Sequence, residues 1–179
     1  MIIAVAGRRI DAVDVKPPRF PLPNVVLVQR RVDQLFNREG ATALVSSAAC
    51  GADLVALTVA QARHMRRRVV LPFARDEFRA RSVTDRPGDW GPVYDRVLAE
   101  LDKTNDVVTL AGHAAEDAAY AAANDAILHE AATLASQGTA DVVAVLVWEG
   151  EARRDGDITA AFGIGARKRG YRVEQVDTL

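Results

Sequence analysis

The sequence predicts an α/β domain with a doubly wound, mostly parallel sheet of about six strands and helices on both faces. Two observations carry this prediction. Short β-branched runs alternate along the chain with longer segments of helical periodicity, as in repeated βαβ units. Most of the short runs are apolar throughout, which indicates strands that are buried on both faces. This pattern is typical of a Rossmann-like fold.

Each element is bounded by its own local signals. Asn24 is placed to cap the first helix, and Gly40, Gly138 and Gly170 fall where helices should stop. The proline-rich stretch 16–23 is expected to be a surface loop, and the irregular stretch 74–89 leads into the third helix. The predicted strands cover residues 2–6, 43–46, 68–71, 106–110, 142–148 and 172–176, and the predicted helices cover 24–38, 52–64, 90–102, 116–136 and 159–169.

Length and composition restrict the class of protein. The chain has 179 residues, 49% of them hydrophobic, which suits one domain over residues 1–179 and leaves too little for two. The net charge of -1 offers no general basic field, so nucleic acid is not the expected partner. No apolar run approaches the roughly 20 residues that span a bilayer, so we expect a cytoplasmic protein without a membrane partner.

The sequence offers little for a metal or a cofactor. Cys50 is the single cysteine, so an intrachain disulfide is excluded. His64, His113 and His129 are scattered at spacings that do not suit metal ligands. A Walker A sequence is absent, and Gly163-Ile164-Gly165 begins like a dinucleotide fingerprint but precedes a strand. We therefore expect no metal and no bound cofactor.

Ligands of such sheets bind beyond the carboxyl ends of the strands, where loops lead into helix N-termini. Three loops of this sequence combine small residues with side chains that suit phosphate. Their candidate binding residues are Gly7, Arg8 and Arg9 after the first strand, Ser46, Ser47, Cys50, Gly51, Ala52 and Asp53 after the second, and Trp148, Gly150, Asp157 and Thr159 after the fifth.

The second loop is the best phosphate candidate, because its serines, alanines and glycine let the backbone approach a ligand. An ordinary strand-to-helix turn is an equal alternative, and for Asp53 alone the preferred interpretation is an acidic residue that complements the helix dipole. Arg8 and Arg9 could each fork onto a phosphate, with a surface salt bridge as the alternative for one of them. Cys50 as a nucleophile is disfavoured, since no histidine is predicted near it.

Aromatic and polar residues elsewhere extend the candidate site. Tyr120 and Asn124 lie four apart on the long alanine-rich helix, so they share a face and either line the cleft or satisfy one another. Aromatic faces suit a base, although a partly buried aromatic cluster is the preferred interpretation of Trp90 and Phe78. The candidates in this group are Pro72, Phe73, Ser82, Trp90, Tyr94, Tyr120 and Asn124.

The order and spacing of several motifs resemble the SLOG superfamily. These motifs are the run from Ala48 to Leu57, Val70-Leu71-Pro72-Phe73, Phe78-Arg79 with Ser82-Val83, Trp90-Gly91, Val145 to Gly150, and Asp157-Ile158-Thr159-Ala160. The superfamily gathers LOG-type phosphoribohydrolases, DprA-like proteins and ligand-sensing domains of channels and of bacterial signalling or defence systems. The resemblance implies a cleft for nucleotides or nucleotide-derived ligands, and relatives often dimerise.

Catalytic LOG proteins carry PGGxGTxxE in the fifth-strand loop. Aligning Thr159 with the threonine of this motif puts Phe162 at the glutamate, so the carboxylate that would stabilise an oxocarbenium-like state is missing. If Glu149 or Asp155 supplied the missing carboxylate from a displaced position, an enzymatic function would still be possible. Asp157 is better placed as the N-cap of the last helix.

Three functions remain open. The preferred one is binding or sensing of a nucleotide-derived small molecule, in bacterial signalling or defence. The second is a LOG-like or deoxyribosyltransferase-like enzyme that cleaves a nucleotide N-glycosidic bond. The third is an interaction domain that has lost its ligand. For assembly, the alanine-rich residues 114–135 are expected to pack within the monomer, with a homodimer as the alternative.

Overall fold

The computed structural model describes residues 1–111, 116–138, 140–153 and 155–179. Its sheet has six strands in the order β4-β3-β2-β1-β5-β6, and every pair of neighbouring strands is parallel. This confirms the predicted α/β fold class. The strands are β1 (Ile2–Gly7), β2 (Ala43–Ser46), β3 (Arg66–Leu71), β4 (Val107–Thr109), β5 (Val142–Val147) and β6 (Arg172–Val176).

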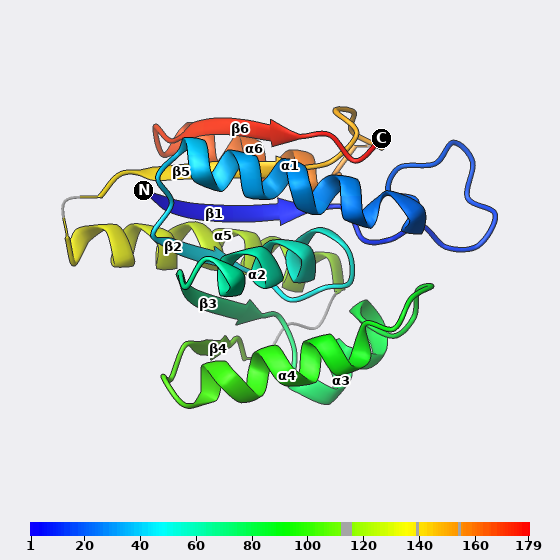
Figure 1. The fold of residues 1–179 in the computed structure, drawn as a ribbon, viewed down its shortest axis with the longest axis horizontal. Coiled ribbons are helices and arrows are strands. Elements are labelled where there is room, and N and C mark those ends of the chain that lie inside the picture. Colours follow the sequence, from blue (N-terminus) through cyan, green and yellow to red (C-terminus); the bar gives the residue numbers. More distant parts are fainter. Residues whose placement is uncertain (112–115, 139, 154) are drawn as a thin grey trace.

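Helices cover both faces of the sheet (Figure 1). Helices α1 and α2 lie on one face, with α3 and α4 towards β4, while α5 and α6 lie on the other. The helices are η1 (Leu22–Asn24), α1 (Val25–Arg38), α2 (Ala52–Ala62), α3 (Arg75–Ser82), α4 (Gly91–Asp102), α5 (Glu116–Ser136) and α6 (Ile158–Lys168).

The hydrophobic core has two layers, one on each face of the sheet. Alternate residues of β1 pack into opposite layers. Ile3 and Val5 belong to the cluster that includes α1, α2 and α4, and Ile2 and Ala4 belong to the cluster that includes α5 and α6. Because both faces are covered, a strand such as β5 is buried at every position. This explains the uninterrupted apolar runs of the sequence.

The strand order reverses between β1 and β5. These two strands pair from Ile2↔Val142 to Gly7↔Val147, yet the chain leaves β1 towards α1 and β5 towards α6, on opposite faces. Such a switch point opens a crevice at the carboxyl edge of a sheet. Gly7 ends β1 there, and a Cβ atom on it would come within 2.5 Å of the Val147 carbonyl oxygen and of the Ala52 Cβ atom. The close approach of three elements therefore requires glycine.

Two local expectations were wrong. Residues 75–82 of the stretch expected to be irregular form α3, which buries only Phe78 and Ser82 and so leaves a weak apolar pattern in the sequence. Asn24 precedes α1 but makes no side-chain cap, because its Nδ2 donates instead to the Thr178 carbonyl oxygen at 2.9 Å. Gly40 and Gly170 follow α1 and α6 with φ of 57° and 77°, as expected of helix stops.

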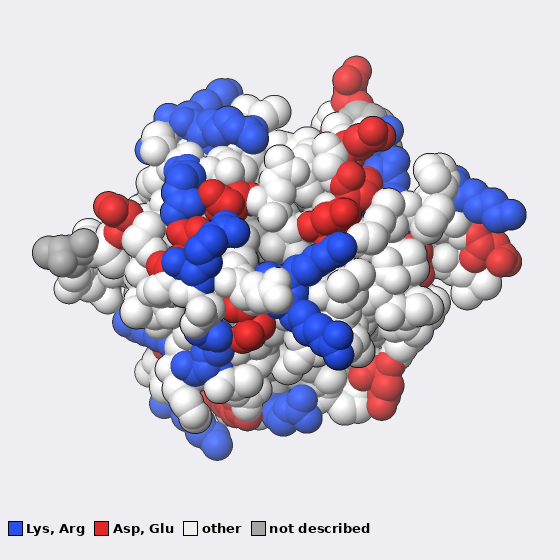
Figure 2. Space-filling view, turned by 45° about the horizontal axis from the view of Figure 1, so that its top comes forward, with Lys and Arg blue, Asp and Glu red and all other residues white. Residues whose placement is uncertain are grey.

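Charges of both signs are interspersed over the face shown in Figure 2. Ion pairs join elements of the fold, such as Arg38 with Glu174 (2.8 Å) and Arg68 with Glu130 (2.7 Å). Among the described helices, none is both long and apolar enough to cross a membrane.

Candidate functional site

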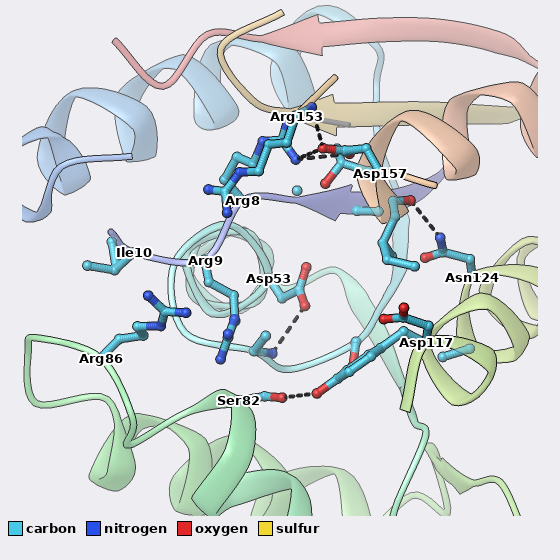
Figure 3. Close-up of a pocket in the computed structure, with 18 of the residues that line it drawn as sticks. Arg8, Arg9, Ile10, Asp53, Ser82, Arg86, Asp117, Asn124, Arg153 and Asp157 are labelled. Carbon is cyan, nitrogen blue, oxygen red and sulfur yellow. Dashed lines mark hydrogen bonds and ion pairs between the residues drawn. The ribbon is translucent and has the colours of Figure 1, made fainter. Parts of the chain in front are cut away.

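A cavity of about 420 Å³ lies at the switch point, beyond the carboxyl ends of β1 and β2 and beside the loop between β5 and α6. The N-terminal ends of α2 and α6 reach it, and α5 forms its opposite wall (Figure 3). Its lining residues are Val5, Ala6, Gly7, Arg8, Arg9, Ile10, Asp11, Ala12, Val15, Ser47, Ala49, Asp53, Phe78, Ser82, Arg86, Glu116, Asp117, Tyr120, Ala123, Asn124, Ile127, Arg153, Gly156, Asp157, Ile158 and Thr159.

About half of the residues proposed from the sequence line this cavity, and all three loops contribute. Those in the lining are Gly7, Arg8, Arg9, Ser47, Asp53, Ser82, Tyr120, Asn124, Asp157 and Thr159. The lining does not include Ser46, Cys50, Gly51, Ala52, Pro72, Phe73, Trp90, Tyr94, Trp148 or Gly150, nor the carboxylates Glu149 and Asp155.

Arg8 is held in a buried ion cluster. Its Nε donates to Glu149 Oε2 at 2.7 Å, its Nη1 donates to Asp157 Oδ2 at 2.7 Å, and its Nη2 donates to the Glu151 carbonyl oxygen at 2.6 Å. The Trp148 ring lies 5.4 Å from the guanidinium carbon and adds a cation–π contact. Arg8 is only 6% exposed. Its donors are thus occupied by protein acceptors.

The cluster fixes the ionisation of its members. Burial opposes the charge of Arg8, but its hydrogen bonds to Glu149 and Asp157 outweigh this and raise its pKa. Burial likewise opposes the charge of Glu149, yet Arg8 holds the pKa of this carboxyl below its usual range. Asp157 shows the same balance, because the N–H groups of Ala160 and Arg153 and the Arg8 guanidinium together lower its pKa.

Asp157 also caps α6, as predicted. Its Oδ1 accepts from the Ala160 backbone N–H at 3.0 Å, and its Oδ2 accepts from the Arg153 N–H at 2.9 Å. Glu149 is engaged a second time by Arg19 from the loop after β1. The ion cluster therefore connects the β1 and β5 loops across the switch point.

The cavity has a basic side formed by Arg9, Arg86 and Arg153 (Figure 3). Arg9 Nη1 donates to Asp85 Oδ2 at 2.8 Å, and Arg86 Nε donates to the same oxygen at 3.2 Å, so two cations share one carboxylate. Burial, followed by repulsion from Arg8 and Arg19, lowers the pKa of Arg153. An anion here would relieve that repulsion.

The α5 wall carries acceptors and neutral polar groups. Asp117 and Asn124 lie opposite the arginines (Figure 3), and Asn124 Nδ2 donates to the Ile158 carbonyl oxygen at 2.8 Å. Tyr120 Oη and Ser82 Oγ are joined by a hydrogen bond of 2.7 Å. Of the two alternatives left open for Tyr120 and Asn124, the structure has the first: both line the cavity, and each bonds to a partner on a different element and not to the other.

Asp53 lies on the floor of the cavity, in the first turn of α2. It is 7% exposed, and its Oδ2 accepts from the Ala49 backbone N–H at 3.1 Å. Burial raises the pKa of Asp53 to about 7, against the lowering effects of Ala49 and Arg9. Nearby, Ser47 Oγ is buried without a hydrogen-bond partner among the described residues, as is Asp11 Oδ1.

Several candidates outside the cavity lining are explained by their packing within the fold. Cys50 is fully buried, and burial raises the pKa of its thiol to about 11, so the thiolate needed of a nucleophile is scarce. Gly51 has φ of 92°, and a Cβ atom on it would lie 2.7 Å from the Arg8 carbonyl oxygen. Tyr94 stacks on Phe78 at 6.1 Å, and Trp90 Nε1 donates to the Pro87 carbonyl oxygen. These aromatics pack α3 against α4.

Sequence reasoning missed several lining residues. Arg86 lies in the stretch that was expected to be irregular, and Arg153 lies in the fifth-strand loop among charged neighbours. Glu116 and Asp117 open α5 and were outside the proposed set, although acidic residues in a first helical turn are a signal that could have drawn attention to them. His113 falls outside the described residues, and the described part of the chain contains no His/Cys/Asp/Glu group that could hold a metal ion.

No protein-family model matches the chain, and no curated protein matches its sequence. Among solved structures, the fold is similar to DNA processing protein A (DprA) from Streptococcus pneumoniae, with 15% sequence identity and a TM-score of 0.44. The match covers 96% of this chain and 57% of that one, so the chain spans little more than half of that protein's length. The likeness concerns the fold alone.

Proposed function

We propose that this chain binds a nucleotide-derived small molecule with an anionic group and does not cleave it. The cavity of about 420 Å³ falls within the range of roughly 300–1,000 Å³ that is usual for small-molecule sites. It also lies at the topological switch point, where open α/β sheets bind their ligands. Together with the SLOG resemblance, this supports a role as a ligand sensor in bacterial signalling or defence.

The observation that carries the proposal is the segregation of charge across the cavity. Arg9, Arg86 and Arg153 lie on one side, and Asp117 and Asn124 lie on the other (Figure 3). Arginines bind phosphate groups through charge-assisted hydrogen bonds. Carboxylate and amide oxygens accept from the hydroxyl and amino groups of a sugar or a base. A nucleotide presents both kinds of group at opposite ends.

The same geometry argues against cleavage of an N-glycosidic bond. Phe162, at the position of the LOG glutamate, is 1% exposed and packs in the core between the sheet and α6. Glu149 is occupied by Arg8 and Arg19, and Asp155 is exposed outside the cavity lining. The two acids proposed as displaced catalytic groups thus lie outside the cavity.

The test combines a thermal-shift screen with product analysis. AMP, ADP-ribose, NAD and cyclic nucleotides are added to the protein, and each ligand that raises Tm is incubated and analysed by chromatography. A ligand at 100 times its Kd should add about 2.7 kcal/mol to the unfolding free energy. We expect stabilisation with intact ligand. Release of free base would favour the enzyme, and no shift with any compound would favour the interaction domain.

A further inference from the structure

We propose that Asp53 and Ser47 form a subsite on the cavity floor that binds the sugar hydroxyl groups of the ligand. This inference rests on the proposed function and deepens it, because it assigns one part of the ligand to one part of the cavity. It makes the pocket selective for ribose over deoxyribose.

The first support is the unfilled bonding capacity of Asp53. One carboxyl oxygen accepts from Ala49, while Oδ1 makes no hydrogen bond within the described part of the chain. The residue is 7% exposed, and Figure 3 shows its carboxyl group turned into the cavity. This Oδ1 oxygen is not one of the buried atoms that lack a partner, so it is accessible from the cavity and can accept a hydrogen bond from a ligand hydroxyl group.

Ser47 supplies a second, independent observation. Its Oγ is buried and has no hydrogen-bond partner among the described atoms, although the residue lines the cavity. The neighbouring hydroxyl differs, because Ser46 Oγ donates to the Ser47 carbonyl oxygen at 2.7 Å and is thereby satisfied. Only one of the two adjacent serines therefore presents an unused hydroxyl to the cavity.

The chemistry of this pair selects the group that it binds. In its ionised form the Asp53 carboxylate only accepts hydrogen bonds, and it repels a phosphate. A serine hydroxyl both donates and accepts. Adjacent sugar hydroxyls match this set, since each can donate to Asp53 and exchange a hydrogen bond with Ser47. The phosphate then extends towards Arg9, Arg86 and Arg153, away from the floor.

The experiment measures sugar selectivity by calorimetry, with AMP, 2′-deoxyAMP, 3′-deoxyAMP and IMP as probes. A hydrogen bond to a charged group contributes about 1.5–3 kcal/mol, or roughly 10- to 100-fold in affinity. We expect the wild-type chain to lose about that factor with at least one deoxy analogue. Asp53→Asn and Ser47→Ala should each reduce the ratio of AMP to deoxyAMP affinity at least several-fold.

Asp141→Asn is the matched control, because Asp141 is exposed just before β5, at the opposite edge of the sheet. It should keep the wild-type ratio. If Asp53→Asn fails to fold, Ser47→Ala alone carries the test.

Equal affinity of the wild type for AMP and both deoxy analogues would overturn the subsite and leave the proposed function intact. A loss with IMP alone would place an amino group on the floor and also overturn it. Absence of binding by every probe would overturn the subsite, and only a further absence of any Tm shift in the wider nucleotide screen would overturn the proposed function as well.

Discussion

Arg8 and Asp53 are both buried charged residues of one cavity, yet their surroundings are opposite. Arg8 meets two carboxylates and a carbonyl oxygen, and its pKa is raised. Among the described residues Asp53 accepts from one backbone N–H, and burial raises its pKa to about 7, so both its ionised and its neutral form are populated near neutral pH. A buried group whose bonds are satisfied holds the fold together, whereas one left unsatisfied indicates where a ligand belongs.

Removing Arg8 should have the largest effect on stability. Arg8→Met leaves Glu149 and Asp157 buried without their shared cation, and we expect a loss of about 3–5 kcal/mol in the unfolding free energy at pH 7. Urea denaturation measures it. The loss should shrink in acid, where both carboxyls take up protons. Arg9→Met is the control, with an expected loss of at most about 1 kcal/mol; equal losses would refute the contrast.

Asp53→Asn should raise the unfolding free energy, whereas Arg8→Met lowers it. Folding raises the pKa of Asp53 from 3.8 to about 7, so the folded state binds this proton more tightly than the unfolded state. The wild-type chain therefore loses stability as the pH rises from about 4 to 7. The variant lacks this loss and should be more stable at pH 8, by up to about 4 kcal/mol. Thermal unfolding from pH 4 to pH 8 tests this, and parallel curves for the two proteins would contradict it.

A smaller effect is expected where α2 begins beside the Arg8 backbone. Gly51→Ala would combine φ of 92° with a Cβ atom 2.7 Å from the Arg8 carbonyl oxygen. Overpacking of this kind costs about 1–3 kcal/mol. Gly138→Ala is the matched change in open space, where nothing lies within 4 Å of the added Cβ atom. Chemical denaturation of both variants should show a loss for Gly51 alone.

Arg9→Ala should separate binding from stability. The Arg9–Asp85 ion pair is partly exposed, so its removal should change the unfolding free energy by about 0.2–1 kcal/mol. If Arg9 binds the phosphate, affinity for AMP should fall by roughly 10-fold or more. Calorimetry with wild type and variant measures this. An unchanged affinity would leave Arg9 as a surface ion pair only.

The fold could be predicted from the sequence because strand and helix periodicity is local. The runs of β1 and β5 are apolar at nearly every position, and the helices that cover them end at glycines such as Gly40 and Gly170. The Asp157 cap could likewise be predicted, since an N-cap bonds to a backbone group three residues on. Helix α3 was missed because its two buried residues leave too little apolar pattern.

The bonding state of the cavity's charged residues was decided only by the tertiary structure. Arg8 and Glu149 are 141 positions apart, and they meet because β1 pairs with β5 in one register. Adjacent Arg8 and Arg9 look alike in sequence, but one is buried in an ion cluster and the other pairs with Asp85 near the surface. From the sequence alone, Asp53 is an ordinary acidic residue in the first turn of a helix, and only the tertiary structure shows that it is buried. Burial and remote pairing depend on how distant segments meet, and no local pattern encodes them.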